Sequence, residues 1–99
     1  MTGKPSIEET IDIAFQNTIF KDPVSGWFCV EMPKSGEIFG TRNPVKIAGT
    51  VEGHPFEATL MPLGNGNHML PLRATLRKLI KKELGEEVTI HLLKNIKKT

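Results

Sequence analysis

The stretch that decides the fold runs from Val45 to Arg73, VKIAGTVEGHPFEATLMPLGNGNHMLPLR. Apolar and polar residues alternate over Val45–Val51 and again over Phe56–Leu60, with the period of two that is typical of half-buried strands. The pair Glu52-Gly53 offers a two-residue turn, and Asn65-Gly66 is a strong hairpin signal because both of its residues tolerate positive φ. The stretch therefore predicts a three-stranded antiparallel meander, with both turn glycines at positive φ.

Three further segments show the alternation of a strand. They are Thr10–Phe20, Trp27–Met32 and Val88–Leu93. Between them, Lys34–Gly40 is too short for more than one or two helical turns. We therefore predict a mainly β domain of six short strands closed into a small barrel, an arrangement that leaves few strand edges exposed.

One amphipathic helix is predicted over Ala74–Leu84, followed by Gly85 as a left-handed C-terminal cap. Its apolar stripe consists of Leu76, Leu79, Ile80 and Leu84. Its exposed arc carries Arg77, Lys78, Lys81 and Lys82, with Arg73 at its start.

A weak internal repeat is visible in the order of these elements. Both Trp27–Ile47 and His68–Ile90 read as strand, break, short helix, glycine and strand, with Gly40 and Gly85 as the glycines. Two half-barrels fused in one chain would close the barrel without a second subunit. We therefore expect a monomer rather than a dimer.

Length and composition indicate a single domain. The 99 residues are enough for one core, which we place at residues 8–95, between a flexible leader at 1–7 and a basic tail at 96–99. The single cysteine, Cys29, excludes an internal disulfide and indicates a reducing compartment. No apolar run reaches the ~20 residues of a membrane span. A cytoplasmic location is expected.

The net charge of +2 is unevenly distributed along the chain. Residues 1–72 contain five Lys/Arg and eight Asp/Glu, a net of −3, whereas residues 73–99 contain eight and three, a net of +5. A basic surface can attract phosphate or acidic partners, and arginine forks suit carboxylate and phosphate. The candidate binding residues are Arg42, Arg73, Arg77 and Lys78.

The sequence offers no assembled catalytic or metal site. The histidines His54, His68 and His91 lack the spacing of a metal motif, and no base is placed beside Cys29. We expect no catalytic residue, no metal and no cofactor, and we do not expect an enzyme.

Several motifs resemble the bacterial domain of unknown function 1905 family. They are the turn Phe39–Arg42, the hairpin Val45–Phe56, the turn Pro62–Leu70 and the closing strand Gly85–Ile90. The resemblance covers about residues 10–94, and one departure is Gly85-Glu86 where the family usually has Gly-Asp. It implies a double-split β-barrel fold but no assigned activity.

A more distant resemblance concerns the segment LPLRATLRKLIKKELGEEVTI. It is similar to swapped-hairpin barrel DNA-binding proteins, the antitoxin and transition-state regulators, and it implies that Arg77 and Lys78 lie near DNA-contacting positions. Two functions remain open. The first is a non-catalytic binding or accessory module for an unknown ligand or protein partner; the alternative is a nucleic-acid-binding regulator that uses the basic helix.

Overall fold

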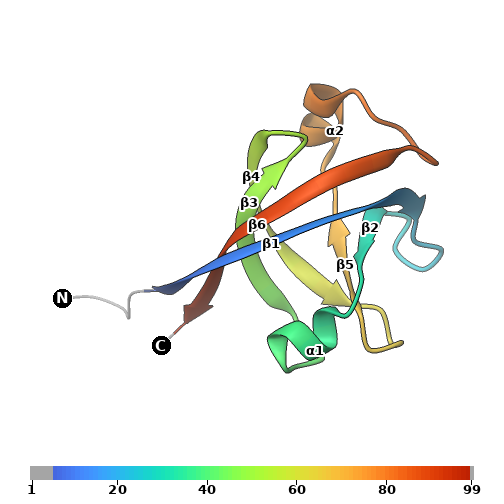
Figure 1. The fold of residues 1–99 in the computed structure, drawn as a ribbon. Helices are drawn as coiled ribbons and strands as arrows, with labels where there is room; N and C mark the ends of the chain where they lie inside the picture. Colours follow the sequence, from blue (N-terminus) through green and yellow to red (C-terminus); the bar gives the residue numbers. More distant parts are fainter. Residues whose placement is uncertain (1–5, 99) are drawn as a thin grey trace.

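Six antiparallel strands form a closed barrel in the computed structural model, which describes residues 6–98 (Figure 1). Every strand pairs with two neighbours, in the order β1–β2–β5–β4–β3–β6 and back to β1. The strands are β1 (Ser6–Lys21), β2 (Phe28–Met32), β3 (Val45–Val51), β4 (His54–Pro62), β5 (His68–Pro71) and β6 (Glu87–Lys98). The helices are α1 (Ser35–Phe39) and α2 (Ala74–Ile80). The prediction of a mainly β, six-stranded barrel is confirmed.

The predicted meander is present as β3, β4 and β5. Glu52 and Gly53 both take positive φ, 49° and 81°, as the tight turn between β3 and β4 requires. The second connection is longer than the predicted two-residue turn, because the N–H of Leu63 donates to the carbonyl of Asn67 at 2.9 Å across a five-residue loop. Gly66 has the predicted positive φ, at 95°, but Asn65 does not share it.

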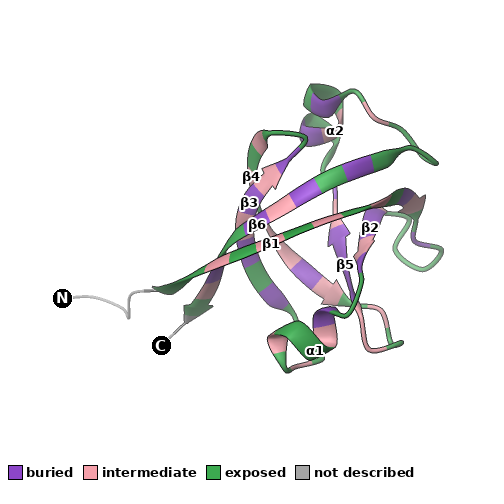
Figure 2. Cartoon of the chain, viewed as in Figure 1, coloured by how far each residue is buried: buried purple, intermediate pink, exposed green. Residues whose placement is uncertain are grey.

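The core fills the barrel and is built from the inward face of every strand (Figure 2). The alternation in β3 holds, since Val45, Ile47 and Val51 are buried while Lys46 is exposed. The core residues with no more than 1% exposure are Ile19, Val30, Met32, Ile47, Val51, Leu60, Leu70, Val88, Ile90 and Leu92. Binary patterning of this kind is sufficient to place the core.

The strand pairings have an internal two-fold symmetry. Exchanging β1 with β4, β2 with β5 and β3 with β6 leaves every pairing in the barrel unchanged. The axis passes between Val30 and Leu70 on one side and between Thr50 and His91 on the other, because in each of these opposed pairs the two residues are also equivalent by the exchange. The repeat indicated by the sequence is therefore present in the architecture.

The helix prediction was wrong at its C-terminal end. α2 ends at Ile80, and the cap is Lys81 at φ 56°, whose N–H donates to the carbonyl of Arg77 at 2.9 Å. The left-handed residue turns the chain away before the last predicted turn, so Leu84 lies outside the helix and is exposed, as is Leu79. A second short helix, α1, is present at the other end of the barrel (Figure 1). Its C-terminal cap is Gly40, which is left-handed like Lys81 at the end of α2.

The predicted boundaries of the domain also differ from the structure. Ser6 and Ile7 belong to β1 rather than to a leader, and residues 96–98 belong to β6 rather than to a tail. The two strand ends form a ribbon that carries the ion pairs Lys94–Glu8 at 2.9 Å and Lys97–Glu9 at 3.6 Å. The rest of the predicted leader and tail, residues 1–5 and 99, lies outside the described residues. Within residues 6–98 no helix is long and apolar enough to cross a membrane.

Candidate ligand-binding groove

The barrel is incompletely paired between β4 and β5. β3 pairs with β4 from His54 to Leu60, whereas β5 pairs with β4 only at Met61 and Pro62. Within residues 6–98, the edge of His54–Leu60 that faces away from β3 therefore has no strand partner. The chain leaves β5 at Leu72, whose N–H donates to the carbonyl of Phe28 at 2.8 Å, and then enters α2.

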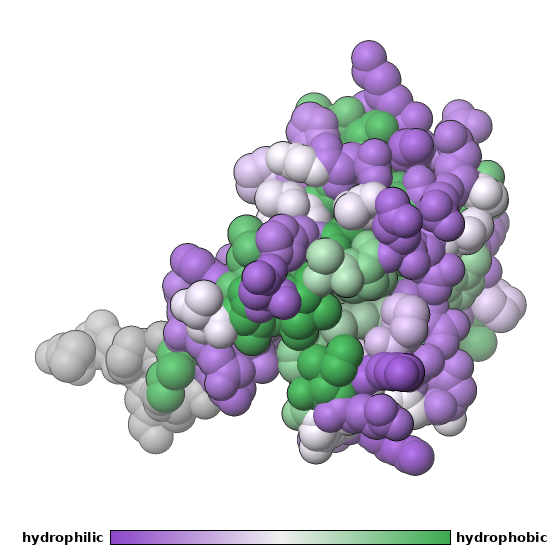
Figure 3. Space-filling view, viewed as in Figure 1, coloured by the Kyte–Doolittle hydropathy of each residue, from purple (hydrophilic) through white to green (hydrophobic). Residues whose placement is uncertain are grey.

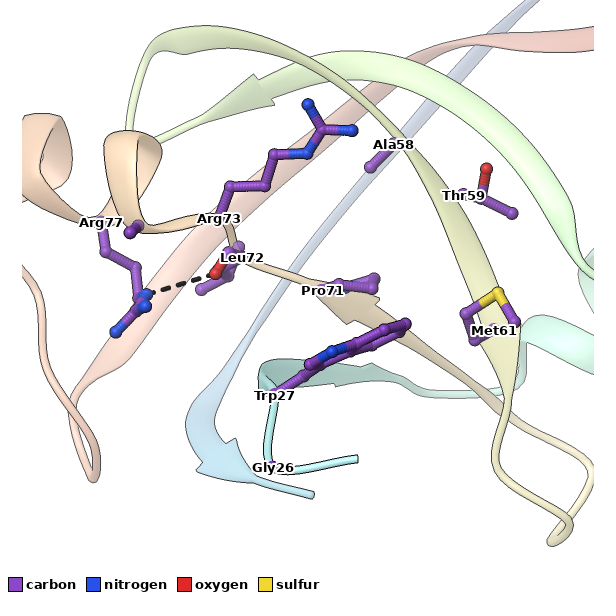
Figure 4. A pocket seen from close by; sticks show the side chains of 10 residues that line it. Gly26, Trp27, Ala58, Thr59, Met61, Pro71, Leu72, Arg73 and Arg77 are labelled. Atoms are coloured by element: carbon purple, nitrogen blue, oxygen red, sulfur yellow. Dashed lines mark hydrogen bonds between the residues drawn. The ribbon is translucent and has the colours of Figure 1, made fainter. Parts of the chain in front are cut away.

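A hollow of about 520 Å³ opens in this gap (Figure 4). One side carries Trp27, Pro71 and Met61, and the guanidinium of Arg73 reaches over it towards β4. Trp27, the only tryptophan of the chain, is 49% exposed. The lining residues are Gly26, Trp27, Ala58, Thr59, Met61, Pro71, Leu72, Arg73, Ala74 and Arg77.

A second hollow of about 200 Å³ continues the first one along β4 towards Pro55. The two share Ala58, Pro71 and Arg73 in their linings. The second hollow is also lined by Phe56 and Leu79, together with other residues of β4 and α2. We call the two hollows together the β4–β5 groove. Arg73 lies at the junction between them.

The two arginines of the groove are held differently. Arg77 is half-buried, with its guanidinium carbon 3.9 Å from the centre of the Phe28 ring and its Nε donating to the carbonyl of Leu72 at 3.2 Å. Stacking and this hydrogen bond orient the group before any ligand arrives. Arg73 is exposed. Among residues 6–98, neither arginine forms an ion pair with a carboxylate.

The structure does not bring all four predicted binding residues together. Arg73 and Arg77 share the groove, whereas Lys78 faces a neighbouring hollow of about 390 Å³ beyond α2. Arg42 is exposed in the loop that follows α1, and α1 lies at the end of the barrel opposite to α2 (Figure 1). The neighbouring hollow is lined by Ala74, Arg77, Lys78, Lys81, Lys82, Glu83 and Glu86, so the arc of cations includes two acids.

A buried polar cluster joins α1 to β5. His68 and Ser35 are both fully buried, and the Nε2 of His68 lies 2.8 Å from the carbonyl of Asn43. A carbonyl can only accept, so Nε2 carries the proton and the Ser35 hydroxyl donates to Nδ1 at 2.7 Å. The same hydroxyl accepts the N–H of His68 at 2.6 Å. Each of these buried polar groups therefore has a hydrogen-bond partner, and the hydrogen bonds hold α1 against β5.

Cys29 is buried, and its thiol is held in the protonated form. Burial, followed by the neighbouring Asp22 carboxylate, raises the pKa of the Cys29 thiol to about 11, so the thiol is protonated and inert at neutral pH. Hydrogen bonds from the backbone N–H and the hydroxyl of Ser25 lower the pKa of Asp22. Over residues 6–98, no three His, Cys, Asp or Glu side chains are placed to hold a metal ion.

The apolar half of the groove was not predicted from the sequence. Trp27, Met61 and Pro71 lie on three different strands or strand ends, and only the barrel topology brings them together. A signal existed for Trp27, because the alternation in Trp27–Met32 places it on the face opposite to Phe28, Val30 and Met32. An aromatic residue on the outer face of a small barrel is typical of a binding surface.

A small β-barrel with one open gap is the class of protein that this fold and groove define. A family model described as "Domain of unknown function (DUF1905)" matches residues 15–92. The chain therefore belongs to the DUF1905 family, as its motifs predicted. No curated protein matches the chain. On the face that Figure 3 shows, small groups of apolar side chains lie between polar ones.

Proposed function

We propose that the protein is a non-catalytic binding module that takes an anionic ligand with an apolar portion in the β4–β5 groove. The observation that carries this proposal is the juxtaposition in one hollow of an exposed tryptophan and two arginines that have no carboxylate partner among residues 6–98. The volume of about 520 Å³ falls within the range of small-molecule sites.

The chemistry of the lining supports an anion with an apolar part. Arg77 is oriented in advance by Phe28 and Leu72, so less side-chain entropy is lost when it binds a carboxylate or phosphate. Trp27 and Met61 offer apolar surface on the other side of the hollow. A charged hydrogen bond contributes about 1.5–3 kcal/mol, which is enough to select an anion over a neutral analogue.

A binding role fits the positions of the nucleophilic side chains better than a catalytic one. Cys29 and Ser35 are both fully buried. Ser35 is hydrogen-bonded to a histidine, as in a nucleophile–base pair, but a substrate could reach neither group without opening the fold.

Nucleic-acid binding by the basic helix is the second candidate. Its support is the hollow that Lys78, Lys81 and Lys82 share next to α2. The acids Glu83 and Glu86 line the same hollow, and Arg77 is held against Phe28. A phosphate backbone would therefore meet both signs of charge, which makes this candidate the weaker one.

The test uses the fluorescence of Trp27, the only tryptophan, during titration with 4-phenylbutyrate and with its neutral amide. We expect a saturable blue shift with both, and an affinity for the carboxylate that is higher by about tenfold. Arg73→Gln should remove the preference for the carboxylate. Arg42→Gln, which changes another exposed arginine outside the groove, should leave it unchanged. Equal binding of acid and amide, or no saturable shift, would contradict the proposal.

A further inference from the structure

The internal symmetry gives the barrel two equivalent gaps, and only one of them is bridged. β2 pairs with β1 only at Ile19–Lys21, so the preceding part of β1 faces the first gap as β4 faces the second. In the first gap the side-chain amide of Asn17 donates to the carbonyl of Glu31 at 3.0 Å. No side-chain hydrogen bond joins β4 to β5 among residues 6–98.

The two gaps differ because the residues at their symmetry-equivalent positions differ. Ile19 and Leu60 are the equivalent buried residues of β1 and β4, so Ala58 takes the position of Asn17. By the same symmetry, Pro71 takes the position of Glu31. The methyl group of alanine cannot donate across the gap, and both Ala58 and Pro71 line the groove. The second gap is therefore open where the first is closed by a side chain.

The open gap exposes the edge of a strand. On β4, alternate residues direct their N–H and C=O groups to β3, and the residues between them direct theirs into the groove. The lining includes every β4 residue from Pro55 to Met61 except the buried Leu60, and these seven positions at about 3.3 Å each span roughly 23 Å. This is the length of an extended peptide of six or seven residues, and such an edge is a template for one more strand.

The side chains along the groove specify the composition of such a peptide. Apolar residues stand exposed towards its two ends, Trp27 at 49% and Leu79 at 58%. Arg73 lies between them, at the junction of the two hollows, and Arg77 is next to it on α2. Glu57 also lines the groove but is paired with Lys46 at 3.3 Å, so the charge that complements the middle of the groove is negative.

We propose that the occupant of the β4–β5 groove is an extended peptide segment that adds to the free edge of β4, with an acidic side chain at Arg73 and Arg77 and apolar residues on either side of it. This rests on the proposed function and names the chemical class of its ligand. The backbone of the segment pairs with β4, and its apolar side chains cover Trp27 and Leu79.

The first experiment is selection of a random heptapeptide library on the purified protein, followed by titration of the selected tryptophan-free peptides against Trp27 fluorescence. The enriched sequences should have Asp or Glu flanked by Leu, Ile, Val or Phe. Ala58→Asn restores the bridging amide of the first gap and should weaken binding by about tenfold or more. Ala14→Asn, at an exposed position of β1, is the matched control and should have no effect.

Methylation of the peptide backbone then separates strand addition from binding through side chains. N-methyl groups at alternate positions should abolish binding, and those at the intervening positions should be tolerated, because only every second N–H faces β4. A library without enrichment, or a peptide that tolerates methylation equally everywhere, would overturn the peptide proposal. If 4-phenylbutyrate still binds through Arg73, the proposed binding function holds with a small-molecule ligand. If 4-phenylbutyrate does not bind either, the proposed function and the peptide proposal both fail.

Discussion

Removing the Ser35 hydroxyl should cost far more stability than its size suggests. In Ser35→Ala, the N–H of His68 loses its acceptor at 2.6 Å and Nδ1 loses its donor at 2.7 Å, and both residues are fully buried. A buried polar group without a partner costs about 1–3 kcal/mol, so the two together cost about 2–6 kcal/mol. This is a large part of the roughly 5–15 kcal/mol that holds a domain folded.

The control is Ser25→Ala, which removes the same number of hydrogen bonds at an exposed position. The Ser25 hydroxyl donates to Asp22 at 2.8 Å and accepts the N–H of Trp27 at 3.1 Å. Water can replace the hydroxyl there, so we expect a loss below about 1 kcal/mol.

Urea unfolding followed by circular dichroism measures both free energies, and the slopes should match the wild type. The melting temperature of Ser35→Ala should fall by about 4–8 °C for each kcal/mol lost. Equal losses of stability in the two variants would refute the reasoning, because burial would then add nothing to the cost of the lost bonds.

Four further predictions follow from other parts of the structure. Gly49→Ala should destabilise the fold by about 3 kcal/mol or more in urea unfolding, because the added Cβ would lie 2.0 Å from the carbonyl oxygen of His91; a mild variant would contradict the close approach. The pKa of Cys29 is raised from about 9 to about 11, so the unfolded chain releases this proton first and stability should fall as the pH rises through that window; Cys29→Ala should show a smaller fall, and an identical fall would count against the shift. Sedimentation equilibrium should return the monomer mass of 11.0 kDa, whereas a dimer would contradict the fused half-barrels. Duplex DNA should not bind at physiological salt; binding whose affinity falls with salt at about −0.9 per phosphate contact would instead support the regulator.

The pattern of the strands could be predicted because it depends on local alternation. Val45–Val51 is buried on one face, as the period of two indicates, and Gly53 takes the expected positive φ. The end of α2 could not be predicted in this way. A lysine in the left-handed region is uncommon, so nothing in the sequence marked Lys81 as the C-terminal cap of the helix. Gly85 has the residue type that is typical of such a cap, and it therefore placed the predicted end of the helix too late.

The site depends on contacts between residues that are distant in the sequence. Ser35 and His68 are 33 positions apart, and their pairing requires the register of β2 with β5. The helical pattern predicts that Arg77 faces solvent as part of the basic arc. In the structure its guanidinium stacks on Phe28, and only the tertiary structure brings these two residues together. The repeat in the sequence predicted the symmetry of the barrel. It did not show that Ala58 leaves one of the two gaps open.

The most direct test of the groove is a map of amide and indole chemical-shift changes in a ¹⁵N-labelled sample during titration with 4-phenylbutyrate. We expect the largest changes at the Trp27 indole, over Ala58–Met61 and over Leu72–Arg77, with little change in α1 or at Arg42. Changes centred on the loop around Arg42, or on the far side of α2 at Lys81 and Lys82, would contradict the assignment of the β4–β5 groove as the binding site.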